Sequence, residues 1–287
     1  MTWDISDKQV LITGGTSGIG RATGAELARR GASVTVTSRK LASAEAAAVE
    51  ISRDTNSKVA AAELDLSSLK SVRHFSSRYA AANDRLDLLI NNAGSIAGRY
   101  RTTADGFEWT LGVNHLGPFL LTNLLIDLLE TSAPSRVINV SSENHRGAKN
   151  GLDFADLQMT NGYGSSRAYA ASKLANILFT VELDRRFRDR DLTARALHPG
   201  VVATNFGKDA GSPRWMGVAM TLLKPFLSTP EKGAATSVHL ATARTAELDL
   251  GIYWSGRKPK QPSAQALDND AALKLWDLSA ELVGLSI

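Results

Sequence analysis

The chain has 287 residues, of which 43% are hydrophobic and 22% are charged, and its formal net charge at pH 7 is +4. This is an ordinary globular composition, and so mild an excess of positive charge does not by itself indicate a nucleic-acid partner. The chain contains no cysteine, which excludes disulfides and thiolate metal sites and leads us to expect a reducing, cytoplasmic location.

Short runs rich in β-branched residues alternate with longer amphipathic runs. The strands predicted from these runs lie at residues 9–13, 33–38, 58–65, 86–92, 136–142, 193–199 and 251–255. The predicted helices lie at about residues 18–30, 41–53, 67–82, 107–129 and 165–188. This alternation indicates βαβ units with a parallel sheet, and right-handed crossovers make that sheet doubly wound. We therefore predict one Rossmann-like α/β domain over residues 1–287, with about seven strands and helices on both faces of the sheet.

Two segments interrupt this alternation. Residues 146–164 follow the fifth predicted strand, and residues 205–228 follow the sixth. Ligands of a doubly wound sheet bind beyond the carboxyl ends of its strands, so both segments should lie at that edge. The second segment ends in the apolar run 215–228, which we expect to cover a substrate as a lid. A helix that closes the core, a contact between subunits and a membrane contact are the alternatives.

Neither a membrane span nor a nucleic-acid site is predicted. The chain begins with acidic residues and passes directly into a folded pattern, so we expect no signal peptide. The run 215–228 is broken by Lys224 and Pro225 and is too short to span a bilayer. In the most basic stretch, residues 183–195, arginines are interleaved with aspartates, which is typical of a solvated helix face.

A glycine-rich sequence, ITGGTSGIG, follows the first predicted strand and opens the first predicted helix. Gly14, Gly18 and Gly20 allow positive φ and a close approach of the backbone to a ligand. Free N–H groups and the helix dipole stabilise a phosphate at the start of a helix. The loop therefore predicts a site for the pyrophosphate of a dinucleotide, although a tight turn without a ligand could use the same residues.

The end of the second predicted strand indicates which nicotinamide dinucleotide binds. An acidic residue there would accept hydrogen bonds from the ribose hydroxyls of NAD. The sequence instead has Ser38 and Arg39, followed by Lys40. Because a guanidinium pairs well with a phosphate, these residues favour NADP(H) over NAD(H). The alternative is that Arg39 opens a helix and faces water.

In the sequence AYAASKLAN, Tyr169 precedes Lys173 by one turn of a predicted helix. Residues at this spacing share a helix face, so the ammonium can lie near the phenol and favour its ionised form. Tyr169 could then act as a general acid in carbonyl reduction and as a general base in alcohol oxidation. Ser142, the second of two adjacent serines at the end of the fifth strand, could donate a hydrogen bond to a substrate oxygen that gains negative charge.

Seven short motifs occur in the order of a known family. They are TGGTSGIG, LDLSS with Asp65, NNAG at residues 91–94, GVNHLG with Asn114, NVSS with Ser142, YAASK and HPGVVAT. Over nearly its whole length the chain resembles the short-chain dehydrogenase/reductases. VNHLGPF, SSENHRG and YAASKLANILFT resemble the retinol-dehydrogenase-like group of this family. We expect no membrane anchor like that of the membrane-bound retinol enzymes, which argues against retinoids as the physiological substrates.

The resemblance implies roles for individual residues. Asn114 would hold a water that links Lys173 to solvent, and Lys173 would also bind the nicotinamide ribose. Asp65 would accept a hydrogen bond from the adenine amino group, and Thr204 would contact the nicotinamide amide. The predicted catalytic residues are Asn114, Ser142, Tyr169 and Lys173. The predicted cofactor contacts are Gly14, Thr16, Ser17, Gly18, Ile19, Gly20, Ser38, Arg39, Lys40, Asp65, Leu66, Asn92, Ala93, Gly94, Tyr169, Lys173, Pro199, Gly200, Val202 and Thr204.

Each of these assignments has a structural alternative. Tyr169 and Lys173 could be ordinary helix neighbours. Asn114 could bend its helix, and Asp65 could cap the helix that follows it. Asn91 is expected to join neighbouring strand ends. The histidines at positions 115, 145 and 198 lack the spacing of a metal site and are expected to be structural, with a substrate contact of His145 as the alternative.

Together these features predict an NADP(H)-dependent oxidoreductase, such as a carbonyl reductase, that acts on a small lipophilic alcohol and its aldehyde or ketone. A catalytically silent NADP-binding regulatory protein is the alternative. The resemblance also implies a homodimer or homotetramer, because the helices that carry Asn114 and Tyr169 often form subunit contacts in the family. We predict no nucleic-acid partner and no metal site.

Overall fold

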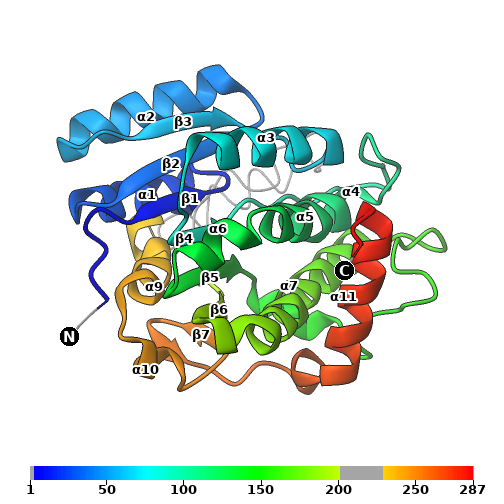
Figure 1. Ribbon diagram of the computed structural model, residues 1–287. Helices are drawn as coiled ribbons and strands as arrows, with labels where there is room; N and C mark the ends of the chain where they lie inside the picture. Colours follow the sequence, from blue (N-terminus) through cyan, green and yellow to red (C-terminus); the bar gives the residue numbers. More distant parts are fainter. Residues whose placement is uncertain (1–2, 201–228, 287) are drawn as a thin grey trace.

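One eight-stranded sheet organises the described part of the computed structural model, residues 3–200 and 229–286 (Figure 1). Its strands are β1 (Gln9–Ile12), β2 (Ser33–Ser38), β3 (Ala60–Glu63), β4 (Leu88–Asn91), β5 (Ser135–Val140), β6 (Leu192–Leu197), β7 (Tyr253–Ser255) and β8 (Lys258–Pro259). Their order is β3-β2-β1-β4-β5-β6-β7-β8, and all neighbouring pairs are parallel except β7 and β8. The chain order reverses between β1 and β4, so their carboxyl ends flank the point at which doubly wound sheets bind ligands.

Helices cover both faces of this sheet (Figure 1). The α-helices are α1 (Gly18–Arg29), α2 (Leu41–Thr55), α3 (Leu69–Ala82), α4 (Trp109–Leu111), α5 (Gly117–Leu124), α6 (Ile126–Thr131), α7 (Ser165–Phe187), α9 (Pro230–Thr242), α10 (Thr245–Leu248) and α11 (Asn269–Val283). A π-helical turn, Gly112–Leu116, joins α4 to α5, and 3-10 turns lie at Glu143–Gly147, Arg188–Arg190 and Ala264–Leu267. Among the helices of the described segments, none is both long enough and apolar enough to cross a membrane.

The two faces of the sheet bury two separate apolar cores. Leu11 packs on one side with residues of α3, α5, α7 and α11. Val10 and Ile12, its neighbours on β1, pack on the other side with residues of α1, α2 and α9. Successive residues of a strand point to opposite faces, which explains this division. All residues of β5 and β6 are buried, so the prediction of a sheet covered on both faces is confirmed.

The structure differs from the predicted elements in several places. Strand β8 is not predicted, because it has two residues and contains Pro259, which cannot donate a ladder hydrogen bond and suits a sheet edge. The helix predicted at residues 107–129 begins at Trp109, because the Glu108 carboxylate accepts hydrogen bonds from the first-turn N–H groups. The helical run changes to a π-helical turn at Gly112–Leu116 and is interrupted at Leu125. Helices α9, α10 and α11 are additional to the predicted ones. The predicted lid, residues 205–228, lies outside the described residues.

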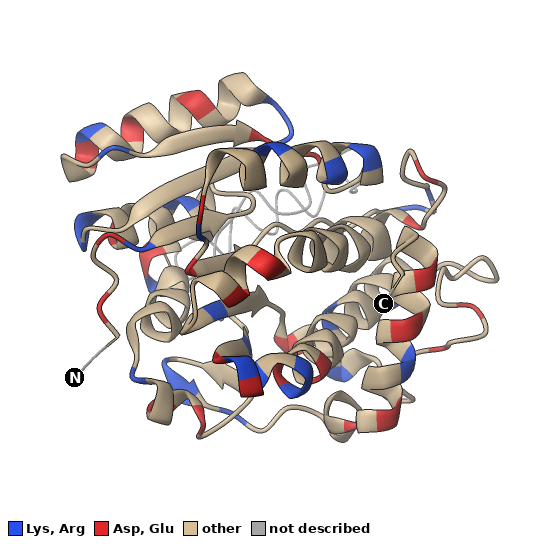
Figure 2. Cartoon of the chain, in the orientation of Figure 1, with Lys and Arg blue, Asp and Glu red and all other residues tan. Residues whose placement is uncertain are grey.

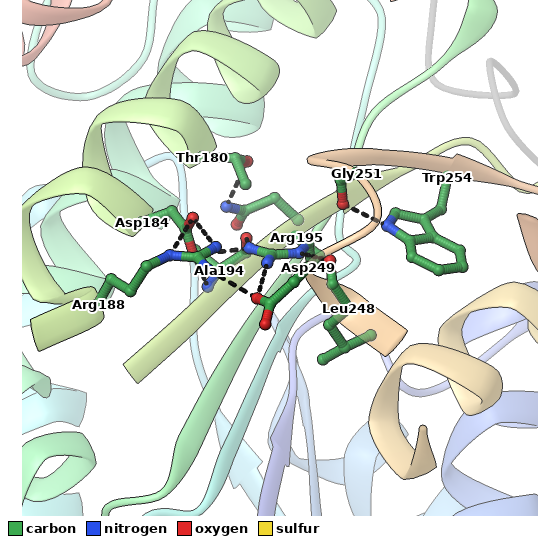
Figure 3. A network of polar contacts seen from close by, with 10 residues as sticks. Thr180, Asp184, Arg188, Ala194, Arg195, Leu248, Asp249, Gly251 and Trp254 are labelled. Atoms are coloured by element: carbon green, nitrogen blue, oxygen red, sulfur yellow. Dashed lines mark hydrogen bonds and ion pairs between the residues drawn. The ribbon is translucent and has the colours of Figure 1, made fainter. Parts of the chain in front are cut away.

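The basic stretch at residues 183–195 contains ion pairs, and Figure 2 shows both signs of charge interspersed on the helices. Arg188, in the 3-10 turn that follows α7, pairs with Asp184 of α7. Arg195 departs from the predicted solvated face, since its side chain is only 2% exposed. From β6 it donates to the Asp184 carboxylate and to the carbonyl oxygen of Leu248, both at 2.7 Å (Figure 3). This network joins β6 to α7 and α10.

Candidate active site

The glycine-rich loop between β1 and α1 is fixed against the end of β4. The Thr13 hydroxyl accepts hydrogen bonds from the N–H groups of Asn92 and Ala93, both at 3.1 Å. The Asn92 amide in turn donates to the carbonyl oxygens of Thr13 and Gly14, at 2.9 and 3.1 Å. Gly20 approaches so closely that a Cβ atom would lie 2.3 Å from the Gly14 oxygen. The packing of Gly20 against the Gly14 backbone therefore requires glycine.

The first turn of α1 has free backbone donors. Ser17 is the N-cap residue, but within the described structure its side chain makes no capping hydrogen bond, and the first turn has no acidic residue. The N–H groups of that turn are therefore available to an external acceptor. Gly14 and Gly18 have φ values of +64° and +52°, which bring the loop backbone around the helix start. This geometry fits a pyrophosphate group.

A cavity runs along the carboxyl ends of the central strands. It is lined by Gly14, Thr16, Ser17, Gly18, Ile19, Gly20, Thr37, Ser38, Arg39, Leu64, Asp65, Leu66, Asn92, Ala93, Gly94, Ser95, Trp109, Val113, Val140, Ser141, Ser142, Tyr169, Lys173, Pro199 and Gly200. Of the predicted cofactor contacts within the described residues, only Lys40 is missing from this lining, because it is exposed at the N-cap of α2. Val202 and Thr204 lie outside the described residues.

Tyr169 and Lys173 on α7 face the end of β5. The Lys173 ammonium lies 5.6 Å from the centre of the Tyr169 ring and donates a hydrogen bond to the carbonyl oxygen of Val140 at 3.0 Å. Ser142 is hydrogen-bonded to Tyr169. Ser141 is buried, and its hydroxyl donates to the carbonyl oxygen of Lys173 at 2.7 Å. The hydroxyl beside the phenol therefore belongs to Ser142.

Burial shifts the pKa values of both residues on α7. It raises the pKa of Tyr169 to about 12, although the hydrogen bond with Ser142 acts in the opposite direction. It lowers the pKa of Lys173 to about 8. Desolvation of the phenol thus outweighs the effect of the nearby Lys173 ammonium on its pKa. A phenol that stays protonated at neutral pH is the form that can give a proton to a carbonyl oxygen.

Asn114 lies in the π-helical turn, with a fully buried side chain. Its amide nitrogen donates to the carbonyl oxygen of Ser95 and to the hydroxyl of Ser172, both at 2.9 Å. Its amide oxygen accepts from the N–H of Ser95 at 2.7 Å. The side chain therefore fixes the loop that follows β4. A π-helical turn locally re-aims the helix and is frequent at functional sites.

Asn91 joins neighbouring strand ends, as predicted. From β4 its amide donates to Asn139 of β5 at 2.9 Å and to Thr122 of α5 at 3.0 Å. The Asn139 amide continues to Thr180 of α7 at 2.9 Å. This buried chain of side chains connects the two helices through the central strands.

The far end of the cavity is formed by β2 and β3. Ser38 and Arg39 line it at the end of β2, and Asp65 lines it after β3. The Asp65 carboxylate accepts hydrogen bonds from the N–H and the hydroxyl of Ser67, at 2.9 and 2.7 Å. Ser68, rather than Asp65, is the N-cap of α3. The end of β2 thus presents a cation and a hydroxyl to the cavity.

The lining residues Ser95 and Trp109 belong to no motif recognised in the sequence. The Trp109 indole N–H donates to the Ser95 hydroxyl at 3.1 Å. The guanidinium of Arg101 lies 3.7 Å from the centre of the indole ring. The position of Trp109 shortly before Asn114 is the only signal that could have pointed to it.

The three histidines are engaged in hydrogen bonds with serines. The pairs are His115–Ser279 at 2.8 Å, His145–Ser142 (carbonyl oxygen) at 2.7 Å and His198–Ser255 at 2.8 Å. Across residues 3–200 and 229–286, no group of three His, Asp or Glu side chains is arranged to hold a metal ion.

Comparison with known proteins gives a consistent pattern of similarity. A family model described as short chain dehydrogenase matches residues 8–215. Human retinol dehydrogenase 13 is 45% identical over 289 residues, which cover 98% of this chain and 86% of the relative. Human retinol dehydrogenase 12 is 45% identical over 279 residues, which cover 97% of this chain and 87% of the relative.

Solved structures share the fold. An uncharacterised protein from Mycobacterium paratuberculosis has a TM-score of 0.74 and 34% identity, with 99% of this chain and 96% of that chain covered. A metagenomic short-chain oxidoreductase, solved in complex with NADP, has a TM-score of 0.61 and 21% identity, with 91% and 97% covered. At that identity the second comparison concerns the fold alone.

Proposed function

The chain belongs to the short-chain dehydrogenase family, and on this basis we propose that it is an NADP(H)-dependent oxidoreductase that interconverts a lipophilic alcohol and its aldehyde or ketone by hydride transfer. One observation carries the proposal: Tyr169, Ser142 and Lys173 line the same cavity as the uncapped start of α1. A dinucleotide on the glycine-rich loop and a substrate oxygen at Tyr169 would then share one site.

Each polar residue of the site has a chemical role in this proposal. The nicotinamide cofactor supplies the hydride chemistry. Tyr169, whose raised pKa keeps it protonated at neutral pH, would donate its proton to the substrate oxygen during reduction. Ser142 would donate a hydrogen bond to the same oxygen as negative charge develops. Lys173 would bind the ribose and place a positive charge near the phenol, and Asn114 would hold the water that links Lys173 to solvent.

The preference for NADP(H) rests on the end of β2. Ser38 and Arg39 line the cavity where an acidic residue would select the free ribose hydroxyls of NAD(H). A guanidinium offers a planar set of donors that suits a phosphate group. We therefore place the 2′-phosphate of NADP(H) beside Arg39.

Apolar residues in the cavity support a lipophilic substrate. Trp109 and Val113 line the same cavity as Tyr169 and Ser142 and offer apolar contact area. The relatives named retinol dehydrogenases act, by their names, on a lipophilic alcohol. Retinol and retinal therefore belong in the substrate panel, together with aliphatic, aromatic and terpenoid carbonyl compounds.

The test is NADPH consumption by the purified protein over that panel, with NADH and a Tyr169→Phe variant in parallel. We expect turnover with NADPH that falls by about 100-fold or more in the variant, while NADPH binding by fluorescence is retained. Binding of NADPH without turnover of any substrate would instead support the catalytically silent regulatory protein. No binding of either nucleotide would overturn the proposal.

A further inference from the structure

The turn after β6 is closed by a hydrogen bond between a histidine side chain and the backbone. Nδ1 of His198 accepts a hydrogen bond from the N–H of Gly200 at 3.0 Å. Gly200 has a φ of +83°, which glycine adopts without strain. Pro199 and Gly200 line the cavity, whereas His198 does not belong to its described lining. His198 therefore shapes a wall of the cavity from behind.

This contact defines the protonation state of the His198 ring. A backbone N–H can only donate, so Nδ1 is unprotonated where it accepts from Gly200. The proton of the neutral ring then lies on Nε2, 2.8 Å from the Ser255 hydroxyl and 3.5 Å from the Glu143 carboxylate. These hydrogen-bond partners define the tautomer of the neutral ring. The neutral ring satisfies the Gly200 N–H, and a doubly protonated ring cannot.

The surroundings of the ring connect the turn to the loop that carries Ser142. The charged and titratable groups around it in the described structure are Glu143, His145, Arg146, Tyr253 and Lys260. Glu143 is central, because its carboxylate pairs with the side chains of Arg146 and Lys260 at 2.6 and 2.9 Å. It directly follows Ser142 in the chain. The cluster thus joins the loops after β5 and β6, both of which line the cavity.

We propose that His198 is a positioning residue for the nicotinamide cofactor, whose neutral ring holds the Pro199–Gly200 turn in its binding shape until protonation releases it. This inference rests on the proposed NADP(H) site. In the protonated ring the Nδ1 proton would face the N–H of Gly200, so the hydrogen bond that closes the turn would be lost. Cofactor affinity should therefore fall as the pH falls.

The pH window follows from the groups around the ring. Burial lowers the pKa of His198, whereas Glu143 acts to raise it and Lys260 acts to lower it. The ring is therefore neutral at neutral pH, and the loss of affinity lies below pH 6.5, the ordinary value for histidine. Burial raises the pKa of Glu143, but hydrogen bonds from Lys260 and Arg146 outweigh this and hold it at about 2. Glu143 thus stays ionised throughout the window.

The experiment measures the dissociation constant of NADPH by fluorescence from about pH 5 to about pH 8. It compares the wild-type protein with His198→Asn and His198→Phe. An asparagine oxygen can accept from the N–H two residues later, as in an Asx turn, but it does not titrate. The Asn variant therefore retains the hydrogen bond at all pH values, and the Phe variant lacks it at all pH values.

Between about pH 8 and about pH 5, we expect the NADPH affinity of the wild type to fall. This fall should be about five- to tenfold larger than the fall seen for His198→Asn. At the upper end, His198→Asn should match the wild type and His198→Phe should bind more weakly by about the same factor. Titration of the cofactor phosphate and of His145 is common to the wild type and the Asn variant, so it cancels in their comparison. His239→Asn is the matched control, because His239 lies on α9 outside the cavity and should leave the wild-type profile unchanged.

Equal pH profiles for the wild type and His198→Asn would overturn the inference and leave the NADP(H) site intact. Wild-type affinity of a folded His198→Phe variant at the upper end would overturn it as well. If circular dichroism shows that the Phe variant does not fold, the comparison with the Asn variant decides alone. Absence of NADPH binding by the wild type at every pH would overturn the proposed function itself.

Discussion

Lys173 and Val140 are joined by a buried hydrogen bond, in which the ammonium donates to the carbonyl oxygen at 3.0 Å. The Asn176 amide donates to the same oxygen at 3.3 Å, so this oxygen would keep a partner without the lysine. Burial lowers the pKa of Lys173 from its ordinary 10.5 to about 8. A buried charge of this kind reduces the stability of the fold. We infer that the Lys173 ammonium serves the chemistry of the site rather than the stability of the fold.

Lys173→Met should therefore separate stability from activity. The variant removes the buried charge, so its free energy of unfolding at pH 7 should be higher by about 1–3 kcal/mol, while carbonyl turnover falls by about 100-fold or more. In the wild type, the unfolded chain binds more protons than the folded one between about pH 8 and pH 10.5. Wild-type stability should therefore rise through this range relative to the variant. Urea unfolding across the range checks this, and a variant less stable than the wild type at pH 7 would contradict it.

Arg39→Ser should change the choice of nucleotide. If the guanidinium pairs with the 2′-phosphate, the affinity for NADPH should fall by about 10- to 100-fold, with little change for NADH. Lys40→Ser is the matched control, because Lys40 is the next residue but does not line the cavity. Its effect on NADPH should be smaller. Dissociation constants for both nucleotides check the prediction, and equal losses for NADPH and NADH after Arg39→Ser would contradict it.

The sequence predicts best the features that depend on local backbone geometry. The glycine-rich loop is one example, since Gly14 needs a positive φ and Gly20 leaves no room for a Cβ atom. Asn91 is another, because strands β4 and β5 lie in register and place it opposite Asn139. In both cases the residue type and its position at the end of a predicted strand are enough to predict the residue's place in the structure.

Features that depend on packing between distant segments are not predictable in this way. Arg195 looks like one of several solvated arginines until β6 places it between α7 and α10. Trp109 carries no motif, and its place in the cavity depends on hydrogen bonds among residues 95–114. The direction of the pKa shift of Tyr169 depends on burial, which the spacing to Lys173 does not reveal.

Trp109→Ala should weaken the binding of bulky lipophilic substrates. The ring lines the cavity and is held between the Arg101 guanidinium and the Ser95 hydroxyl. Loss of an aromatic wall of this kind removes about 1.5–3 kcal/mol of apolar contact, so KM should rise by about 10- to 100-fold. NADPH affinity should stay within about twofold. Steady-state kinetics with large and small aldehydes test this, and an equal rise in KM for both sizes would contradict it.

The matched control for this variant is Trp3→Ala. Trp3 also stacks on an arginine, with the Arg136 guanidinium 4.1 Å from its ring, but it does not line the cavity. Its replacement should leave KM unchanged and lower only the stability. A rise in KM for Trp3→Ala equal to that for Trp109→Ala would show that loss of the cation–π pair, rather than loss of the cavity wall, is responsible.

The buried pair Arg195 and Asp184 should respond asymmetrically to substitution (Figure 3). Asp184→Leu leaves the Arg195 guanidinium buried without its main counter-charge, and it also removes the acceptor of the Ala194 N–H. We expect it to lower the free energy of unfolding by about 3–5 kcal/mol. Arg195→Met should cost less, because Asp184 still pairs with Arg188 and the Ala194 N–H keeps its acceptor. Urea unfolding of both variants and of the double variant measures the coupling directly.

Arg29→Met provides the surface control, because the Arg29 and Glu26 side chains, which pair on α1, are 50% and 36% exposed. An exposed pair of this kind contributes about 0–1 kcal/mol, so this variant should differ little from the wild type. If Arg195→Met proved as damaging as Asp184→Leu, the loss would lie in contacts of the arginine itself. The hydrogen bond from Arg195 to the carbonyl oxygen of Leu248, which ties α10 to β6, would then be the main contribution of the network.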